Sequence, residues 1–379
     1  MRIHYICFEE ATGYGTAAAG LIHALKEAGA EVSVTALRAG RPERGGHLVR
    51  EDAMGPADGV IVHTVPEYYP FWLGRVKART PGVPVWGYAA WETDRLPPHW
   101  PKLLNGMDGM MVPSAWNKEV FVRSGVTRPI QVVPHVSEFH GQLPSDPPSE
   151  VAAKALDTLA DRFTFYTVGV WSERKNTALL LQAFLEEFSG EEQAALLLKT
   201  GEQDWSSYRP RWRRLLTLSP SFHSSSNSCK RLMRPYGPRC VVHLPQRLAS
   251  IDLAWLHARS QCFISLTRGE GWGMGAYEAA WFGNGVAITG YGGQLDYLPA
   301  DAAFHLPYAL KPVSASYGRR SYRQDQNWAC VDLKTARQAM RAIFADQAAC
   351  KARGEKLQQA VREQFSPRHI ASCCLQVFQ

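Results

Sequence analysis

The chain has 379 residues, 45% of them hydrophobic and 20% charged, which is typical of a globular protein with two domains of ordinary size. No run of eighteen apolar residues occurs and MRIHYICFEE lacks a long apolar core, so we expect neither a transmembrane helix nor a signal peptide. Eight cysteines without a C-x-x-C pair argue against a zinc site or a disulfide framework and favour a cytoplasmic protein, while the net charge of +7 favours an anionic partner.

The N-terminal half alternates strand-like and helix-like segments. IHYICF is a predicted strand, ATGYGTAAAGLIHALKEAGA a glycine loop and amphipathic helix, and EVSVTAL a second strand. Further strands are predicted at GVIVHTV, PVWGYAAWE, MDGMMVPS and PIQVVPHV, with a helix capped by Ser114. This order predicts an α/β fold with a doubly wound parallel sheet. Gly13 and Gly15 do not complete G-x-G-x-x-G, which disfavours a dehydrogenase.

A second β-α series follows the polar segment SEFHGQLPSDPPSE, residues 137–150, which is the expected linker. FTFYTVGVW is a predicted strand, SERKNTALLLQAFLEEF a turn and helix, and AALLLKT a strand ending at Lys199. Arg174 and Lys175 fall in the turn, where fixed cations can neutralise a diphosphate.

The stretch from Trp205 to Ile251 contains nine Arg or Lys residues and no Asp or Glu. Aromatic residues are interleaved with the cations, namely Trp205, Tyr208, Trp212 and Tyr236. Such a segment can bind a phosphate backbone or an anionic membrane surface. A solvated amphipathic helix and loop is the alternative interpretation.

The stretch from Thr267 to Gly293 combines a glycine-rich turn, a helix and a strand. The strand CFISL precedes GEGWGMG, a helix is predicted over Ala276 to Trp281, and VAITG is a further buried strand. A helix N-terminus after such a turn suits a phosphate. Glu270 lies in the turn and Glu278 inside the helix, with seven residues between them, and both carboxylates can accept hydrogen bonds from ligand hydroxyls.

This motif, E-G-W-G-M-G-A-Y-E with A-A-W-F-G-N-G-V-A-I-T, resembles the E-x7-E donor site of family-4 retaining glycosyltransferases of the GT-B fold. The segments W-E-T-D, V-P-S-A-W and V-V-P-H-V look like the N-terminal half of the same family. The resemblance implies two Rossmann-like domains facing a central cleft. It implies that Glu270 contacts hydroxyls of the transferred sugar and that Glu278 holds the ribose.

Other roles also follow from the resemblance. Arg174 and Lys175 are expected to bind the donor phosphates, with Lys199 as a second candidate. Further expected donor contacts are Gly13, Tyr14, Gly15, Leu248, Gly271, Trp272, Gly273 and Met274. Where many relatives carry a histidine that contacts the donor sugar, this chain has Ala89, Ala90, Trp91 and Glu92. Glu92 either replaces that histidine or orients its loop.

The implied domains are an acceptor-side domain over residues 1–140, a nucleotide-sugar-binding domain over 141–355 and a C-terminal helix over 356–379 that crosses back to the first. The implied reaction is transfer of a hexose from a nucleotide sugar, UDP- or GDP-hexose, to an acceptor hydroxyl with retention. No Asp-x-Asp occurs, so we expect no metal, and no cofactor is implied.

The acceptor stays open among a glycan or lipid-linked glycan, a hydroxymethylated DNA base and a small natural product. We expect a cytoplasmic location, with peripheral attachment at the inner membrane face as an alternative. A non-catalytic nucleotide-sugar or nucleic-acid binding module, or a nucleotide-sugar epimerase, is the alternative function.

Overall fold

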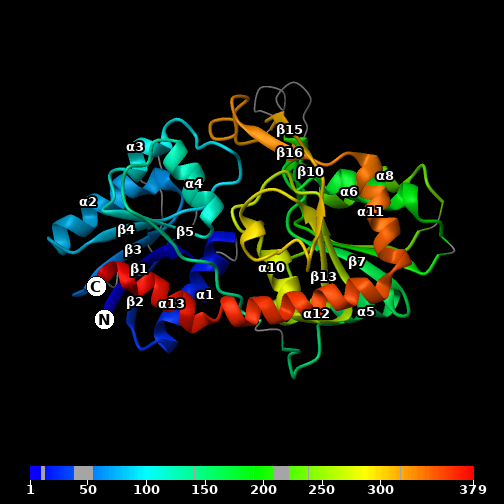
Figure 1. The fold of residues 1–379 in the computed structure, drawn as a ribbon, viewed down its shortest axis with the longest axis horizontal. Helices are drawn as coiled ribbons and strands as arrows, with labels where there is room; N and C mark the ends of the chain where they lie inside the picture. The colour runs from blue at the N-terminus through cyan, green and yellow to red at the C-terminus, as the bar shows by residue number, and fades with distance from the viewer. Residues whose placement is uncertain are drawn as a thin grey trace. The chain divides into compact units, whose positions relative to one another are not determined.

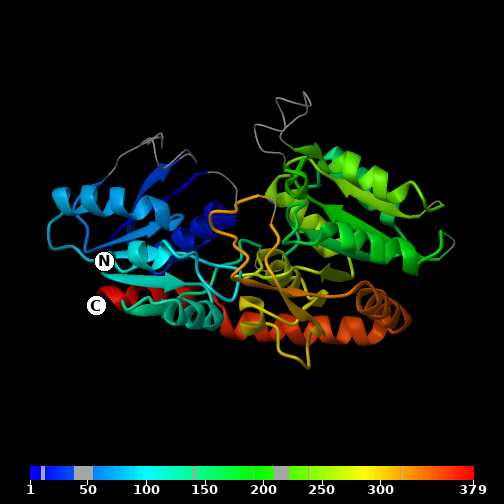
Figure 2. The same ribbon diagram turned by 90° about the horizontal axis from the view of Figure 1, so that it is seen from above.

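The computed structural model describes residues 1–9, 13–37, 54–139, 142–190, 192–208, 222–237, 239–315 and 317–379. The chain divides into two compact units (Figure 1). Unit 1 comprises Met1–Glu138 together with Arg362–Gln379, and unit 2 comprises Phe139–Val361. Each unit is built around its own six-stranded parallel sheet with helices packed against it (Figure 2).

The sheet of unit 1 has the strand order β2-β1-β3-β4-β5-β6, and every pairing in it is parallel. Its strands are β1 (Arg2–Phe8), β2 (Glu31–Leu37), β3 (Gly59–His63), β4 (Val85–Tyr88), β5 (Gly109–Val112) and β6 (Ile130–Val132). Strand β1, which lies between β2 and β3, is buried from Ile3 to Phe8, because parallel sheets of this kind are covered on both faces. The predicted doubly wound sheet is confirmed here.

The helices described in unit 1 pack against this sheet or against one another. They are α1 (Gly13–Glu27), α2 (Tyr69–Arg79), α3 (Trp100–Leu104), α4 (Ala115–Arg123) and α13 (Pro367–Leu375). In α1 the buried positions include Ala17, Leu21 and Ala24, which share one helical face. Helix α13 lies against α1, so the C-terminal segment belongs to the core of unit 1.

The sheet of unit 2 has the order β11-β8-β7-β12-β13-β14 and is also parallel. Its strands are β7 (Phe163–Val168), β8 (Ala194–Lys199), β11 (Val241–Leu244), β12 (Cys262–Ser265), β13 (Gly285–Thr289) and β14 (Phe304–Leu306). Two antiparallel pairs accompany it, β9 (Gln203–Asp204) with β10 (His223–Ser224) and β15 (Ala309–Pro312) with β16 (Asn327–Cys330).

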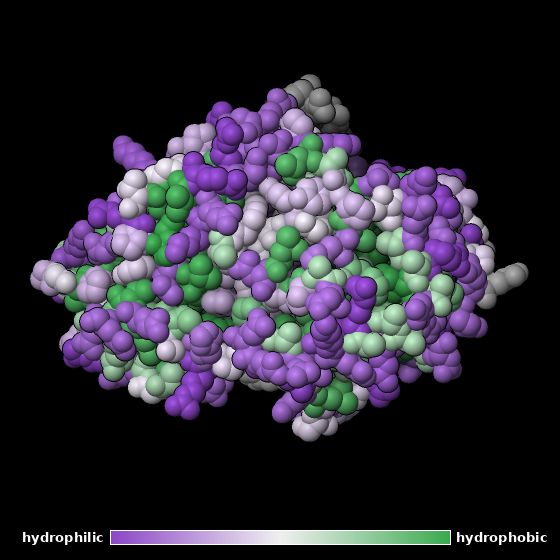
Figure 3. Space-filling model, in the orientation of Figure 1, coloured by the Kyte–Doolittle hydropathy of each residue, from purple (hydrophilic) through white to green (hydrophobic). Residues whose placement is uncertain are grey.

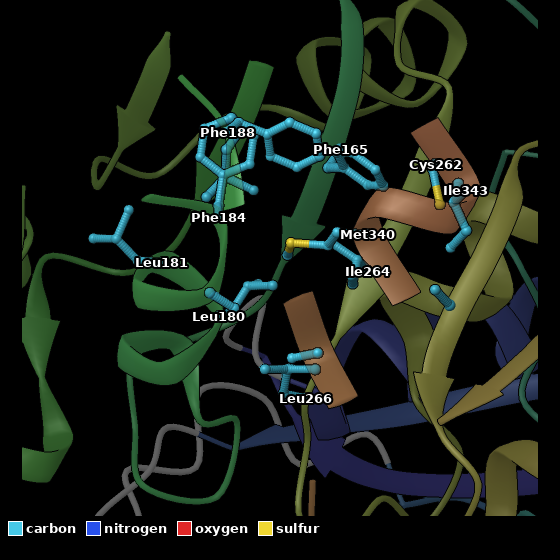
Figure 4. Close-up of a cluster of buried hydrophobic side chains, with 14 of the residues drawn as sticks. Phe165, Leu180, Leu181, Phe184, Phe188, Cys262, Ile264, Leu266, Met340 and Ile343 are labelled. Carbon is cyan, nitrogen blue, oxygen red and sulfur yellow. The ribbon is translucent and has the colours of Figure 1, made fainter. Parts of the chain in front are cut away.

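Helices lie around this sheet or at its edges in the part of unit 2 that the structure describes. They are α5 (Glu150–Leu159), α6 (Thr177–Glu187), α8 (Ser225–Met233), α9 (Ser250–Arg259), α10 (Met274–Trp281), α11 (Leu333–Ala345) and α12 (Gln347–Gln364). Helix α6 packs on α11. The Phe188 ring lies 5.8 Å from that of Phe165 on β7 and 5.1 Å from that of Phe184, measured between ring centroids (Figure 4). This cluster anchors α6, and with it the turn that carries Arg174 and Lys175.

The strand order of unit 2 creates a crossover point. The chain runs from β7 outward to β8 and β11, then returns to place β12 on the other side of β7. Loops leaving the carboxyl ends of β7 and β12 therefore diverge, and ligands of open α/β sheets bind in the crevice formed at such a point. The loop after β7 carries Arg174 and Lys175, and the loop after β12 carries Glu270.

Within the described residues, no helix is long and apolar enough to span a membrane. The face in Figure 3 is largely polar, with small apolar patches between charged side chains. After β13 the chain forms a 3-10 turn over Gly293–Asp296.

Candidate functional site

Glu270 lies at the centre of a polar cluster where the two loops meet. Lys175 Nζ lies 2.6 Å from its Oε1, and Arg174 Nη1 lies 3.0 Å from its Oε2. The Thr267 hydroxyl donates to Oε1 over 2.7 Å. Arg174 also donates to the carbonyl of Gly269 over 2.7 Å, so one guanidinium nitrogen binds both the carboxylate and the backbone of the same turn. Three separate side chains therefore fix the orientation of the Glu270 carboxylate.

The backbone holds the same two loops together. The amide of Arg268 donates to the carbonyl of Arg174 over 2.7 Å. Asn176, which precedes α6, adopts a left-handed conformation with φ of 54°, and this turns the chain sharply into the helix after the two cations. Arg174 and Lys175 thus point at Glu270 because of the turn geometry.

Glu270 stays ionised despite its burial. It is 6% exposed, and burial alone would raise its pKa. The charges of Lys175 and Arg174 and the hydrogen bonds from Lys175 and Thr267 outweigh this effect and lower the pKa to about 2. An ionised carboxylate only accepts hydrogen bonds, so this group can bind donors such as sugar hydroxyls.

The N-terminus of α10 lies beside the cluster because two glycines allow it. Gly273 precedes the helix with φ of 89°, which a residue with a side chain rarely adopts. A Cβ at Gly275 would lie 2.8 Å from the carbonyl oxygen of Val168, so only glycine lets the first turn pack against the end of β7. The first N–H groups of a helix lack partners within it and carry its positive dipole end.

A small pocket opens at this junction. The residues that line it include Gly169, Lys175, Thr200, Ser265, Glu270 and Gly275. Its lining combines a cation, an anion and the start of a helix. This set of groups can bind an anion together with a hydroxylated ligand.

Glu278 lies on α10 behind this pocket and is 6% exposed. Its Oε2 is 3.4 Å from Nε2 of His257 on α9. Among the described residues Glu278 does not line the pocket around Glu270. Its role toward a ribose stays a prediction.

The other residues of unit 2 that were expected to contact the donor lie at the end of β8, in the turn before α10 and in the loop between β11 and α9. Lys199 ends β8 and donates to the carbonyl of Thr200 over 2.8 Å, and burial lowers its pKa. Trp272 is 2% exposed and packs against Tyr277 and Tyr297. Its neighbours Gly271 and Met274 continue the same turn into α10, and Leu248 is half-buried in the loop between β11 and α9.

The candidates of unit 1 gather at the carboxyl edge of their own sheet. Gly13, Tyr14 and Gly15 begin α1, and the Tyr14 hydroxyl lies 3.5 Å from the carbonyl of Ala90. Burial raises the pKa of Tyr14 strongly, and the negative charge of the half-buried Glu92 raises it further. Glu92 therefore lies close enough to Tyr14 for its charge to affect the Tyr14 hydroxyl.

Two buried histidines complete this part of unit 1. The hydroxyl of Tyr5 lies 2.7 Å from Nδ1 of His63, and that of Tyr88 lies 2.9 Å from Nδ1 of His135. Burial holds the pKa of His63 well below its ordinary value and that of His135 at about 3. Both rings are therefore neutral near pH 7.

The basic stretch is described only in part. Arg209, Arg211, Trp212, Arg213 and Arg214 lie outside the described residues. Trp205 and Tyr208 pack with Phe222 and Tyr317, at centroid distances of 4.7 to 5.4 Å. Lys230 and Arg231 belong to α8 and are exposed to solvent.

Sequence reasoning did not find Thr267, His257 or Tyr166. Thr267 stands three residues before Glu270, and this short spacing within one turn was an available signal. His257 and Tyr166 come from α9 and β7, and no local pattern connects them to Glu278. In the described part of the chain, no group of three or more His, Cys, Asp or Glu side chains is placed to hold a metal ion.

No family model and no curated protein matches the sequence. Solved structures do match the fold. HepE of Anabaena in complex with UDP-glucose aligns with a TM-score of 0.68 at 12% identity, over 100% of this chain and 99% of its own. Trehalose-6-phosphate synthase OtsA aligns with a TM-score of 0.70 at 12% identity and the same coverage.

Sucrose-phosphate synthase of Thermosynechococcus elongatus aligns with a TM-score of 0.66 at 16% identity, over 100% of this chain and 98% of its own. These proteins are GT-B glycosyltransferases. At such low identity the likeness concerns the fold. The chain therefore has the GT-B fold, with two Rossmann-like α/β units, as its sequence predicted.

Proposed function

We propose that this protein is a glycosyltransferase that moves a hexose from a nucleotide sugar to an acceptor hydroxyl. The observation that carries the proposal is the cluster of Glu270, Arg174 and Lys175 at the crossover point of unit 2, beside the N-terminus of α10. The fold neighbours support it, because HepE is solved with UDP-glucose and an E. coli trehalose-6-phosphate protein with UDP-2-fluoro glucose.

Different members of the cluster can bind the sugar and the diphosphate of the donor. Glu270 carries a fixed negative charge that accepts hydrogen bonds from sugar hydroxyls. Arg174 and Lys175 bring two positive charges against this single negative one, so the cluster keeps a net positive charge for phosphate oxygens. Cations and helix N–H groups placed where a leaving diphosphate gathers charge stabilise the transition state.

Further roles are part of the same proposal. Glu278 binds the ribose, and Lys199 and Leu248 contact the phosphate and base sides of a UDP- or GDP-hexose. Gly271, Trp272, Gly273 and Met274 shape the turn that receives the sugar. The roles expected of Gly13, Tyr14, Gly15 and Glu92 belong to unit 1 and stay predictions.

Retention of configuration, without a metal or another cofactor, also belongs to the proposal. With retention, a phosphate oxygen of the donor accepts the proton of the attacking acceptor hydroxyl. The acceptor is a glycan, a lipid-linked glycan or a hydroxymethylated DNA base. A membrane-bound acceptor predicts salt-sensitive binding to anionic vesicles, and a DNA acceptor predicts DNA affinity that falls steeply with log salt.

The test is a thermal-shift panel of UDP-, GDP-, ADP- and dTDP-sugars, followed by donor hydrolysis with the shifting sugar. A ligand that binds only the folded state raises the melting temperature. Glu270→Gln keeps the shape of the side chain and is expected to lose at least a hundredfold in turnover. The matched control is Glu355→Gln, a 63% exposed carboxylate on α12, which is expected to turn over like the wild type.

Three outcomes separate the candidates. A rise in melting temperature with one sugar nucleotide, together with donor hydrolysis that is lost in Glu270→Gln, supports a transferase. A shift without any hydrolysis or transfer supports a binding module instead. Unchanged turnover in Glu270→Gln would contradict the role of this carboxylate.

A further inference from the structure

The hairpin of β15 and β16 has an outer strand that is exposed along its whole length. It spans residues 307–330, and the structure describes all of these except residue 316. The two strands form a separate antiparallel sheet, drawn in orange in Figure 1. Every residue of β15 is exposed, whereas Trp328 and Ala329, which face Lys311 and Leu310 across the pair, are buried. The outer strand is therefore the part of the hairpin that a partner can reach.

The inner strand is anchored to the turn that precedes α10. The amide of Ala329 donates to the carbonyl of Arg268 over 2.9 Å, and the Arg268 guanidinium lies 5.5 Å from the ring centroid of Trp328. The buried side chain of Gln326 makes hydrogen bonds to two backbone groups of the connecting loop, over 2.9 and 3.2 Å. These contacts hold the exposed strand on a fixed support.

The tip of the hairpin is held by aromatic packing. The ring centroid of Tyr317 lies 4.9 Å from that of Trp205, 5.3 Å from that of Tyr208 and 5.8 Å from that of Phe222. Tyr317 is nevertheless 47% exposed. Its ring is thus fixed in place and still presents a large part of its surface to solvent.

The outer strand is amphipathic. Successive side chains of a strand point to opposite faces, so Leu310 and Lys311 leave β15 on different sides. Leu310 is 51% exposed, and Tyr308, immediately before the strand, is 42% exposed. Single apolar side chains are common on protein surfaces, but a group of them beside cations is typical of an interaction site.

The same hairpin is strongly basic. Residues 307–327 contain four cations and one acid, which gives this segment a net charge of +3. The cations Lys311, Arg319, Arg320 and Arg323 are all exposed. The single acid, Asp325, pairs with Arg323 over 3.1 Å. The surface therefore attracts a partner that is negatively charged.

An anionic lipid bilayer matches both properties of this surface. Leucine and tyrosine side chains are favourable at the boundary between lipid tails and headgroups, and lysine and arginine bind the anionic lipid phosphates. Long cationic side chains reach the headgroups even when their stems lie along apolar surface. Nucleic acid would satisfy the cations, but its phosphate backbone offers no apolar region to Leu310.

We propose that the β15–β16 hairpin binds the surface of an anionic lipid bilayer, with Tyr308 and Leu310 in the interface and Lys311 and Arg319 at the lipid phosphates. The inference deepens the proposed function, because among the acceptors it favours a lipid-linked glycan, which is presented at such a surface. This statement about the acceptor rests on the proposed function, whereas the binding of the bilayer does not.

The test is co-sedimentation of the full chain with vesicles of phosphatidylcholine, alone or with about one third phosphatidylglycerol, at low and high salt. The wild type is expected to bind the anionic vesicles about tenfold or more tightly than the neutral ones, and high salt is expected to abolish the difference. Lys311→Gln should weaken binding to anionic vesicles about fivefold, as for one lysine near such a surface. Leu310→Thr should weaken it about threefold, because less apolar surface enters the interface.

Matched control variants change the same properties elsewhere on the surface. Lys351→Gln removes an equal charge from α12, where the side chain is 79% exposed. Val122→Thr removes an apolar side chain that is 55% exposed on α4. Both are expected to bind vesicles like the wild type. All four altered side chains are on the surface, so the melting temperatures should stay equal, and this is checked first.

Four outcomes would overturn the inference. The first is a wild type that binds no anionic vesicles, and the second is equal weakening by Lys311→Gln and Lys351→Gln, which would show attraction by net charge alone. The third is binding of duplex DNA but not of vesicles, sensitive to Lys311→Gln and not to Leu310→Thr. The fourth is a dimer in solution that Leu310→Thr dissociates, which would make the hairpin an interface between copies of this chain.

The transferase proposal is tested separately. Vesicle binding is measured without any sugar nucleotide, and donor hydrolysis is measured without any vesicle. Failure of vesicle binding therefore leaves the donor hydrolysis and the role of Glu270 in place. Failure of donor hydrolysis leaves the membrane-binding hairpin in place and removes only its link to a lipid-linked acceptor.

Discussion

The charge of Glu270 predicts a specific dependence of stability on pH. The folded protein lowers the pKa of this carboxyl from its ordinary 4.5 to about 2, because the nearby cations outweigh burial. The unfolded chain therefore binds its proton more readily than the folded one. The stabilisation is complete above about pH 4.5 and is lost as the pH falls toward 2. Glu270→Gln removes this titration and keeps the shape of the side chain.

The size of the effect follows from the two pKa values. A change from 4.5 to about 2 corresponds to about 3 kcal/mol of stability at neutral pH. About 2 kcal/mol of this is lost between pH 7 and pH 3. Urea unfolding of wild type and Glu270→Gln at intervals over this range should show the two free energies of unfolding converging by that amount as the pH falls.

The control is Glu355→Gln, because Glu355 is exposed on α12 and its ion pair with Lys351 is screened by water. Its curve should stay parallel to that of the wild type. If the Glu270→Gln curve also stays parallel to the wild type, the two cations do not hold the carboxyl ionised. The electrostatic basis of the site would then be wrong.

Three further predictions test the scaffold of the site and its cations. Gly275→Ala should cost roughly 1 to 3 kcal/mol of stability in urea unfolding, because its Cβ would lie 2.8 Å from the carbonyl oxygen of Val168. The control is Gly74→Ala in α2, where a Cβ has open space, and this variant should be as stable as the wild type or more stable. Ser114→Ala should cost about 1 kcal/mol by the same measurement, because its hydroxyl accepts the Asn117 amide at the start of α4; equal stability would contradict the cap. Lys175→Met should weaken UDP binding in calorimetry at least tenfold and reduce its dependence on salt, and an unchanged dissociation constant would exclude a phosphate contact.

Much of the fold could be predicted because local pattern and tertiary structure agree. A helix was predicted over Ala276 to Trp281, and α10 occupies Met274–Trp281. The predicted cap at Ser114 is confirmed, because its side chain accepts the amide of Asn117.

The site could be predicted only in part. That Arg174, Lys175 and Glu270 each follow a strand is visible in the sequence. That they meet depends on β12 lying beside β7, about 95 residues apart, and a sequence alone does not reveal strand order. The contact between Glu278 and His257 was not foreseen, because it joins two helices through side chains with no shared pattern.

The division of unit 1 into two pieces of sequence has a consequence for biosynthesis. Helix α13 packs on α1, and the Phe378 ring fills the space beside Gly59, where a Cβ would come within 2.3 Å of it. Domains of a growing chain usually fold in order from the N-terminus. Here the first sheet to leave the ribosome cannot complete its core until residues beyond 361 have been made, whereas all of unit 2 is already available by then. Unit 2 would thus complete its core before unit 1, although unit 1 is translated first.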